Sequence, residues 1–404
     1  MDEETFLLQK LEKISLLLNR NYKDETSLGI LAGVSGMAVF QFYYSKYLNK
    51  DQYSDIGAEM ITYCIEKIND GYSYPTFCNG IAGLGWGIQH LEANDFIDVE
   101  CDELLPQFDV YLYNQMINDL GKGNYDFLHG ALGYGFYFLS RYEHTSNPNL
   151  KNIYQSYLSE LVAELEKLSI SDGLALKWYS PLDFERGNKS FNLSLSHGIS
   201  SILNFTTRLY KFDVFKESTH RLIIGSANYI LGFEDKNCKY SSLFPDVIAE
   251  NIQLKYNGRI AWCYGDLGVG ISLFHAAQAL GDNLMKNRAL EILGYTTTRK
   301  SSDDTLVIDA GICHGSYGNA LIYQKLWQNS GNDIFKESLD FWIEDGIQKA
   351  VHKDSFTGYK QWNGIQKDWL SELSLLRGVT GIGLVIIDYL SKEPNNWDEC
   401  LMIS

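Results

Sequence analysis

The chain has 404 residues, of which 45% are hydrophobic and 21% charged, a composition typical of a globular protein with a large core. Its 51 acidic residues outnumber the 34 basic ones and give a net charge of −17, which argues against nucleic acid or an anionic membrane surface as the main partner. The seven cysteines are scattered, so no disulfide framework is expected. The acidic N-terminus does not resemble a signal peptide, and no apolar run approaches the ~20 residues that span a bilayer. We therefore expect a cytoplasmic protein that does not span a membrane.

A Gly-x-x-Gly step recurs along the chain. The first glycines of the seven steps are Gly33, Gly80, Gly130, Gly198, Gly265, Gly315 and Gly378. In the fourth step Ser201 replaces the second glycine. One such match means little, but seven at intervals that each suit a helix pair indicate a helical array.

An apolar run with helical character follows each step. These runs are 37–48, 84–91, 135–142, 202–210, 271–280, 320–327 and 384–390. A more amphipathic run precedes each step, as in Thr5–Arg20, where apolar residues form one stripe and charged residues the other. The remaining amphipathic runs are 54–69, 102–119, 149–168, 214–231, 285–297 and 332–350. This alternation predicts an all-α fold, an α/α toroid with seven inner and seven outer helices, and we interpret residues 1–404 as one domain of seven helix-pair repeats.

The longer intervals hold extra material, near 169–196, 232–262 and 351–376. Leu174–Tyr179 alternates weakly like a strand, Asn251–Trp262 has extended character, and Ser355–Tyr359 suits a hairpin. The pattern is compatible both with loops and with a small strand-containing insertion.

Two of the steps carry soft metal ligands. Cys263 lies in the motif Trp-Cys-Tyr-Gly, and Cys313 and His314 lie in Cys-His-Gly fifty residues later. Two cysteines and one histidine are ligands that zinc prefers, and a tetrahedral ion would keep its fourth position open, as in catalytic sites. Adjacent residues diverge by roughly 100° in a helix, so Cys313 and His314 can face one ion only from a loop. Either cysteine alone would be more typical of a buried core residue; the matched motifs with a histidine favour zinc.

Other titratable residues lie just ahead of the third to fifth steps. They are Asp126, His129, His197 and Arg259. If the repeats are equivalent, these residues gather with the zinc ligands at one end of the inner ring. A lone histidine at a helix start is more often a cap or a core group, and Asp126 is also typical of an ordinary helix-entry carboxylate. Convergence with a zinc site favours a catalytic role for His197.

These motifs together resemble the lanthionine synthetase C-like family, the cyclases of lanthipeptide biosynthesis and their eukaryotic relatives. The resemblance rests on Trp-Cys-Tyr-Gly, Cys-His-Gly, Ser196-His197-Gly198 and Tyr125-Asp126, and it covers essentially the whole chain. It implies a double-ring α/α toroid in which Cys263, Cys313 and His314 bind Zn²⁺. It also implies that His197 and Asp126 are the acid/base pair and that Arg259 and Tyr264 line the site. His129 and Ser201 depart from the family pattern, and neither is a zinc ligand.

The resemblance implies a zinc-dependent cyclase that adds peptide cysteine thiols to dehydroalanine or dehydrobutyrine. This Michael addition forms (methyl)lanthionine thioether rings. Zinc would deprotonate the thiol, Arg259 would stabilise the enolate, and His197 or Asp126 would transfer the proton. The substrate would be a dehydrated precursor peptide with its leader, and the dehydratase a separate protein. Two alternatives stay open: a transferase that adds a small thiol such as glutathione, and a non-catalytic peptide-binding protein with structural zinc.

Overall fold

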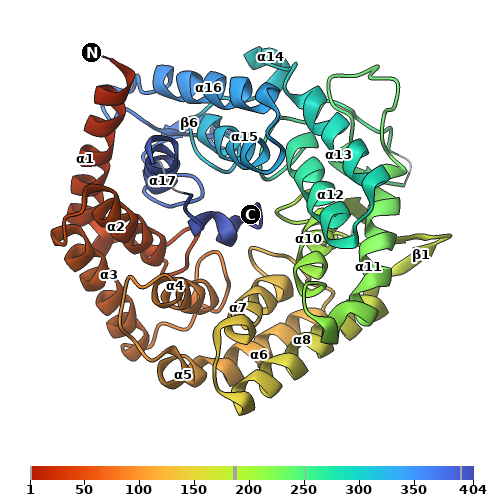
Figure 1. The fold of residues 1–404 in the computed structure, drawn as a ribbon, viewed down its shortest axis with the longest axis horizontal. Helices are drawn as coiled ribbons and strands as arrows, with labels where there is room; N and C mark the ends of the chain where they lie inside the picture. Colours follow the sequence, from red (N-terminus) through yellow and green to blue (C-terminus); the bar gives the residue numbers. More distant parts are fainter. Residues whose placement is uncertain (1, 185–188, 251, 392–393) are drawn as a thin grey trace. The chain divides into compact units, whose positions relative to one another are not determined.

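Long helices alternate along the chain, one almost wholly buried and the next amphipathic, and the short strands among the described residues lie in the longer intervals (Figure 1). The computed structural model describes residues 2–184, 189–250, 252–391 and 394–404. The chain divides into two compact units. The first comprises Met1–Asp109, Ile308–Met402 and Ser404, and the second comprises Val110–Val307 and Ile403.

A buried helix begins directly after each of the seven repeated glycines, which occupy the N-cap positions. These helices are α2 (Val34–Leu48), α4 (Ile81–Ala93), α7 (Ala131–His144), α10 (Ile199–Leu209), α12 (Asp266–Leu280), α15 (Ser316–Ser330) and α17 (Val379–Leu390). In α10 all eleven residues are buried. The predicted apolar helices are therefore confirmed, although each begins a few residues earlier than predicted, because the second residue of the Gly-x-x-Gly step belongs to the first turn.

The amphipathic helices bury one stripe each. They are α1 (Glu3–Asn21), α3 (Gln52–Asn69), α6 (Pro106–Gly121), α8 (Pro148–Leu168), α11 (Asp213–Leu231), α13 (Asn283–Thr296) and α16 (Asp333–Gln348). In α8, Tyr154, Leu158 and Leu165 are buried at helical spacing. The predicted helix over 102–119 is interrupted: the short α5 (Cys101–Leu104) ends before α6 begins. Leu105 keeps helical backbone angles, but Pro106 has no backbone N–H with which to continue the hydrogen bonds of α5.

In the first unit the buried helices α15, α17, α2 and α4 lie side by side in that order (Figure 1). Helix α16 packs on α15, α3 packs on α2, and α1 packs on α17. The Leu376 N–H donates to the Leu31 carbonyl at 2.8 Å, which joins the loops before α17 and α2. The seventh repeat therefore contacts the first, as expected for repeats whose ends are not exposed.

In the second unit the buried helices α7, α10 and α12 lie side by side, and α8, α11 and α13 pack against them. Strands β1 (Ile170–Asp172) and β2 (Ala175–Lys177) form an antiparallel hairpin. Strand β3 (Ser190–Asn192) pairs antiparallel with β4 (Val247–Ala249), so two intervals of extra residues form one small sheet. Four-residue helices α9 (Pro181–Phe184) and α14 (Ser302–Thr305) complete the unit.

The inserted segments contain both loops and short strands, and the hairpin expected at Ser355–Tyr359 lies a few residues further along the chain. In the described part of Asn251–Trp262 there is no strand, and the nearby strand β4 ends at Ala249. Ser355–Tyr359 forms turns, and the hairpin of β5 (Gln361–Asn363) and β6 (Asp368–Leu370) follows it. The hairpin forms there because Trp362 and Trp369 face each other across the strands, with ring centroids 5.3 Å apart.

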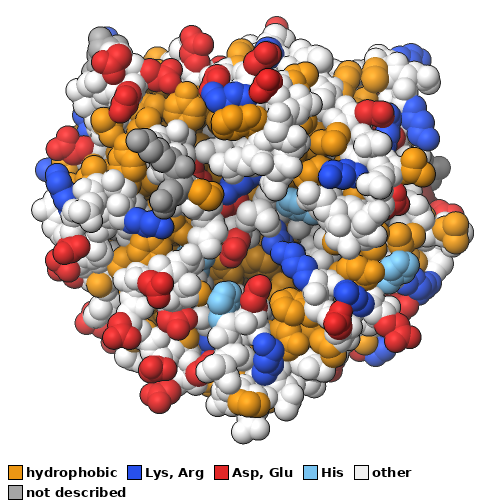
Figure 2. All heavy atoms as spheres, viewed as in Figure 1, with side chains coloured by type: hydrophobic (Ala, Val, Ile, Leu, Met, Phe, Trp, Pro, Cys, Tyr) orange, Lys and Arg blue, Asp and Glu red, His pale blue; other side chains and the backbone are white. Residues whose placement is uncertain are grey.

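The remaining regular segments are the 3₁₀ helices η1 (Tyr22–Asp24) and η2 (Trp397–Leu401). No helix among the described residues is both long and apolar enough to cross a membrane. Figure 2 shows acidic side chains spread over the face drawn there, interspersed with basic and hydrophobic ones.

Candidate active site

The loop before α12 depends on a backbone conformation that only glycine adopts readily. Gly265 has φ +92° and ψ −174°, and an added Cβ would lie 1.9 Å from the carbonyl oxygen of Arg259. Two residues earlier, the Cys263 carbonyl accepts hydrogen bonds from the Ser196 backbone N–H (3.4 Å) and Oγ (3.2 Å). The Trp-Cys-Tyr-Gly motif is thereby fixed directly against the Ser-His-Gly motif of the preceding repeat.

We expect Gly265→Ala to destabilise the protein. Backbone strain of this kind costs on the order of 1–3 kcal/mol for other residues, and the contact with the Arg259 carbonyl adds to it. Gly294→Ala in α13 is the matched control, because its Cβ would meet nothing within 4 Å and alanine favours a helix by up to ~1 kcal/mol. Urea denaturation measures both changes. A Gly265→Ala variant as stable as the wild type would contradict this account of the loop.

His197 and Asp126 form a direct pair in the second unit. His197 Nδ1 lies 2.6 Å from Asp126 Oδ2. Asp126 Oδ1 accepts the backbone N–H groups of Leu128 and His129, both at 2.8 Å. Asp126 is 2% exposed, whereas 17% of the His197 side chain is exposed. The carboxylate is thus held as a hydrogen-bond acceptor that orients an accessible imidazole.

Two more rings lie near this imidazole. The ring centroids of Tyr264 and His129 are 6.1 Å and 6.5 Å from that of His197. Asn192 Nδ2 donates to Tyr264 Oη at 3.1 Å. Burial raises the pKa of Tyr264 to about 12, so its phenol is neutral near pH 7. No motif of the sequence identified Asn192, because this residue of β3 lies in an inserted segment and carries a neutral amide, not a titratable group.

Arg259 and Asp246 lie beside Cys263 in the same unit. Burial raises the pKa of Asp246 to about 6. The positive charge of Arg259 acts in the opposite direction and lowers this pKa, whereas Cys263 raises it further. The backbone carbonyl oxygen of Asp246 also accepts a hydrogen bond from the Leu193 N–H, at 3.0 Å. Cys263 is also joined to the residue before His197, through the two hydrogen bonds from Ser196 to its carbonyl. Asp246, which immediately precedes β4, is a further residue that no motif identified.

Cys313 and His314 belong to the first unit, in the loop ahead of α15. Cys313 is 9% exposed, and its backbone N–H donates to the Leu376 carbonyl at 2.8 Å. His314 is half-buried, with Nε2 3.6 Å from Asp309 Oδ2. That carboxylate is itself held, since it accepts the N–H groups of Gly311 (3.1 Å) and Trp362 (3.0 Å). A fixed carboxylate beside an imidazole is the usual outer partner of a metal-binding histidine.

Cys263, Cys313 and His314 are suited to bind zinc, both in the chemical type of their donor atoms and in the conformation of their backbone. Cys263 and Cys313 are buried thiols, and His314 supplies an imidazole. None of the three lies inside a helix, since α12 begins at Asp266 and α15 at Ser316. Adjacent Cys313 and His314 are therefore free of the helical divergence that would keep them from facing one ion. Such a donor set leaves a fourth zinc position for a substrate group.

The chain is similar over nearly its whole length to a protein of nisin biosynthesis and to a solved nisin cyclase. The nisin biosynthesis protein NisC of Lactococcus lactis subsp. lactis is 22% identical over 406 residues, covering 95% of this chain and 91% of that protein. Among solved structures, nisin cyclase matches with a TM-score of 0.74 and 18% identity, covering 98% of this chain and 97% of that chain. This likeness shows that the fold is the predicted α/α toroid. The model of the family described as lanthionine synthetase C-like protein matches residues 24–402, and the chain therefore belongs to the lanthionine synthetase C-like family.

Proposed function

We propose that the protein is a lanthipeptide cyclase that joins cysteine thiols of a dehydrated precursor peptide to dehydroalanine or dehydrobutyrine. Family membership supports the reaction class. The observation that carries the proposal is the His197–Asp126 pair, because proton transfer needs an oriented, accessible imidazole. The interaction of both Arg259 and Cys263 with Asp246 adds support, since the reaction also needs an anion-stabilising group and a soft metal ligand.

The proposed cofactor is zinc, with Cys263, Cys313 and His314 as its protein ligands. When bound, zinc supplies a Lewis acid that lowers the pKa of a coordinating thiol. The chain's own contribution is to keep its two thiols buried and the imidazole beside Asp309. Two thiolates and a neutral imidazole would balance the charge of a bound zinc ion, which suits a site meant to keep a thiol nucleophilic.

The remaining chemistry falls to residues of the second unit. Attack of the substrate sulfur on the β-carbon forms a C–S bond, breaks the C=C π bond and leaves an enolate. Arg259 is suited to donate hydrogen bonds to the enolate oxygen. His197 is the better proton donor to the α-carbon, because both oxygens of Asp126 accept hydrogen bonds and the carboxylate stabilises the imidazolium. The proton lost by the thiol balances the one gained by carbon.

The proposed substrate is a dehydrated precursor peptide that carries its leader. We also propose that a separate dehydratase prepares this peptide, because the cyclisation consumes residues that are already dehydrated, and that the protein is cytoplasmic. A net charge of −17 suits a basic peptide better than an acidic one.

Incubation with a dehydrated, cysteine-containing peptide tests the reaction. Ring closure is an addition, so we expect the peptide mass to stay constant while alkylatable thiols disappear and fragmentation is suppressed within the new rings. Mass spectrometry of the alkylated product measures all three changes. Because such peptides cyclise slowly unaided, the controls are the Cys313→Ala variant and a reaction without enzyme.

Equal rates and identical ring patterns in enzyme and controls would refute the cyclase and favour a protein that only binds peptides. Glutathione added to the same reaction tests the second alternative. A peptide that gains the mass of glutathione in preference to ring closure would identify a small-thiol transferase, which shares the proposed site and differs only in the thiol donor.

A further inference from the structure

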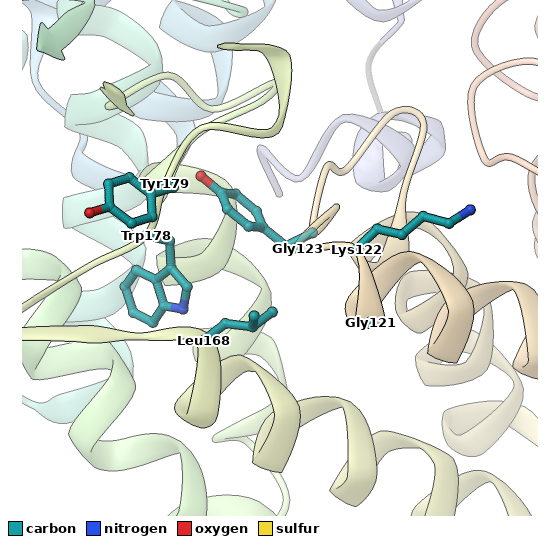
Figure 3. A pocket seen from close by; sticks show the side chains of 7 residues that line it. Gly121, Lys122, Gly123, Leu168, Trp178 and Tyr179 are labelled. Atoms are coloured by element: carbon teal, nitrogen blue, oxygen red, sulfur yellow. The ribbon is translucent and has the colours of Figure 1, made fainter. Parts of the chain in front are cut away.

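A cavity of about 350 Å³ lies in the second unit, beside the segment that carries Asp126 (Figure 3). The rings of Tyr125, Trp178 and Tyr179 line it, together with Leu168 at the end of α8 and the Gly121–Gly123 turn. Figure 3 shows Trp178 and Tyr179 across the space from Gly123, with the Lys122 side chain extending away from both rings. The lining is therefore mainly aromatic and aliphatic.

The aromatic side of the cavity is held in place by neighbouring elements. Trp178 is 1% exposed, and its Nε1 donates to the Leu165 carbonyl of α8 at 2.8 Å. Tyr179 stacks on Phe191 of β3, with ring centroids 5.2 Å apart and an interplanar angle of 18°. A group that enters this cavity meets preformed walls, so little ordering entropy opposes binding.

The opposite side is kept open by two glycines. A Cβ added at Gly121 or at Gly123 would meet no other atom within 4 Å. Gly123 has φ +75° and could not carry a side chain without strain. Gly121 ends α6 and has no such restriction, so a larger side chain there would occupy open space without a clash.

The cavity and the proposed catalytic pair share one stretch of chain. Tyr125 lines the cavity, and the next residue, Asp126, holds His197. Consecutive Cα atoms are about 3.8 Å apart, and this stretch is not helical, so successive side chains can point to different sides. The wall of the cavity and the carboxylate that holds His197 are therefore adjacent residues of one non-helical segment.

We infer that this cavity is a subsite of the proposed cyclase that receives one apolar side chain, preferably aromatic, from the peptide near its reacting residues. This inference rests on the proposed function. The volume is at the low end of the roughly 300–1,000 Å³ of ligand pockets, which suits one side chain better than a whole small-molecule ligand. Tyr179 is the most accessible of the three rings and favours an aromatic guest, because offset or edge-to-face contacts add to the burial of apolar surface.

Binding of a single blocked amino acid tests the subsite apart from catalysis. The probe is N-acetyl-phenylalaninamide, with N-acetyl-alaninamide for comparison, and saturation-transfer NMR of the full chain detects it. We expect the phenylalanine probe to bind the wild type and Gly121→Leu to abolish that binding. Gly294→Leu, at another glycine of the second unit with open space around it, should bind like the wild type. Equal binding of the two probes, or unchanged binding by Gly121→Leu, would overturn the subsite.

Enzyme kinetics complete the test. Two dehydrated peptides are compared that differ only in having Phe or Ala next to the reacting residues. For the Phe peptide, Gly121→Leu should raise KM at least about tenfold while kcat and zinc content stay unchanged. The Ala peptide should show little difference between wild type and variant. Cyclisation with the same KM in both proteins would reject the subsite but keep the cyclase. If the wild type did not cyclise the peptides but bound the phenylalanine probe, and Gly121→Leu blocked that binding, the cyclase proposal would be wrong and the cavity would still be a binding site.

Discussion

The Cys313→Ala variant should lose most of its bound zinc and, with it, the enzyme-dependent part of ring closure. The wild-type protein should carry about one zinc ion, since three ligands in two motifs make a single site. Removal of the partner of a ligating histidine already costs about 10- to 100-fold in metal affinity or activity, and removal of a ligand should cost more. We expect the same result for Cys263→Ala. Elemental analysis of the purified variants measures the metal directly.

A buried cysteine outside the two motifs provides the control. Cys64 in α3 is 0% exposed, so Cys64→Ala removes a thiol of similar burial. It should lower stability, through the cavity that it leaves, and keep the full zinc content. If Cys263→Ala and Cys313→Ala also retained zinc, the assignment of these residues as ligands would be wrong, and both cysteines would be ordinary core residues.

His197→Ala should keep the fold and the zinc but slow ring closure by roughly 10²–10⁴-fold, the usual contribution of a positioned acid or base. The reason is that the carboxylate of Asp126 would then have no imidazole to orient, and the enolate would take its proton from water. Arg259→Ala should slow the reaction by about 10²–10³-fold, as expected for the loss of an anion-stabilising donor. Initial rates of thiol loss, measured beside zinc content, report both effects.

Two controls distinguish a loss of catalysis in these variants from a loss of folding. His144→Ala removes a histidine at the end of α7 that contacts the Ser140 carbonyl, and it should leave the rate unchanged. The pH–rate profile of the wild type should contain a limb that disappears in His197→Ala. Turnover at the wild-type rate by either His197→Ala or Arg259→Ala would remove that residue from the mechanism.

The buried helices were predictable from the sequence because the requirement for glycine is local. An added Cβ at Gly318 would lie 1.9 Å from the Ile312 carbonyl oxygen, and one at Gly381 would lie 2.0 Å from that of Leu375. A loop that folds over the first turn of its own helix favours glycine there, although the fourth repeat accommodates Ser201 at this position. The Gly-x-x-Gly steps therefore identified the helix starts, and the cysteine and histidine motifs were recognisable because they are attached to these steps.

The surroundings of the site required the tertiary structure. Asn192 contacts Tyr264 across 72 positions of sequence, and it does so because β3 pairs with β4. Asp246 and the ring of Trp178 likewise lie in inserted segments, which do not repeat and show no periodicity that marks their buried side. The packing of such segments depends on contacts distant in sequence, as the shifted position of the β5–β6 hairpin also shows. Local glycine chemistry thus determined where the candidate ligands and catalytic residues lie along the chain, whereas long-range pairing decided which other side chains surround them.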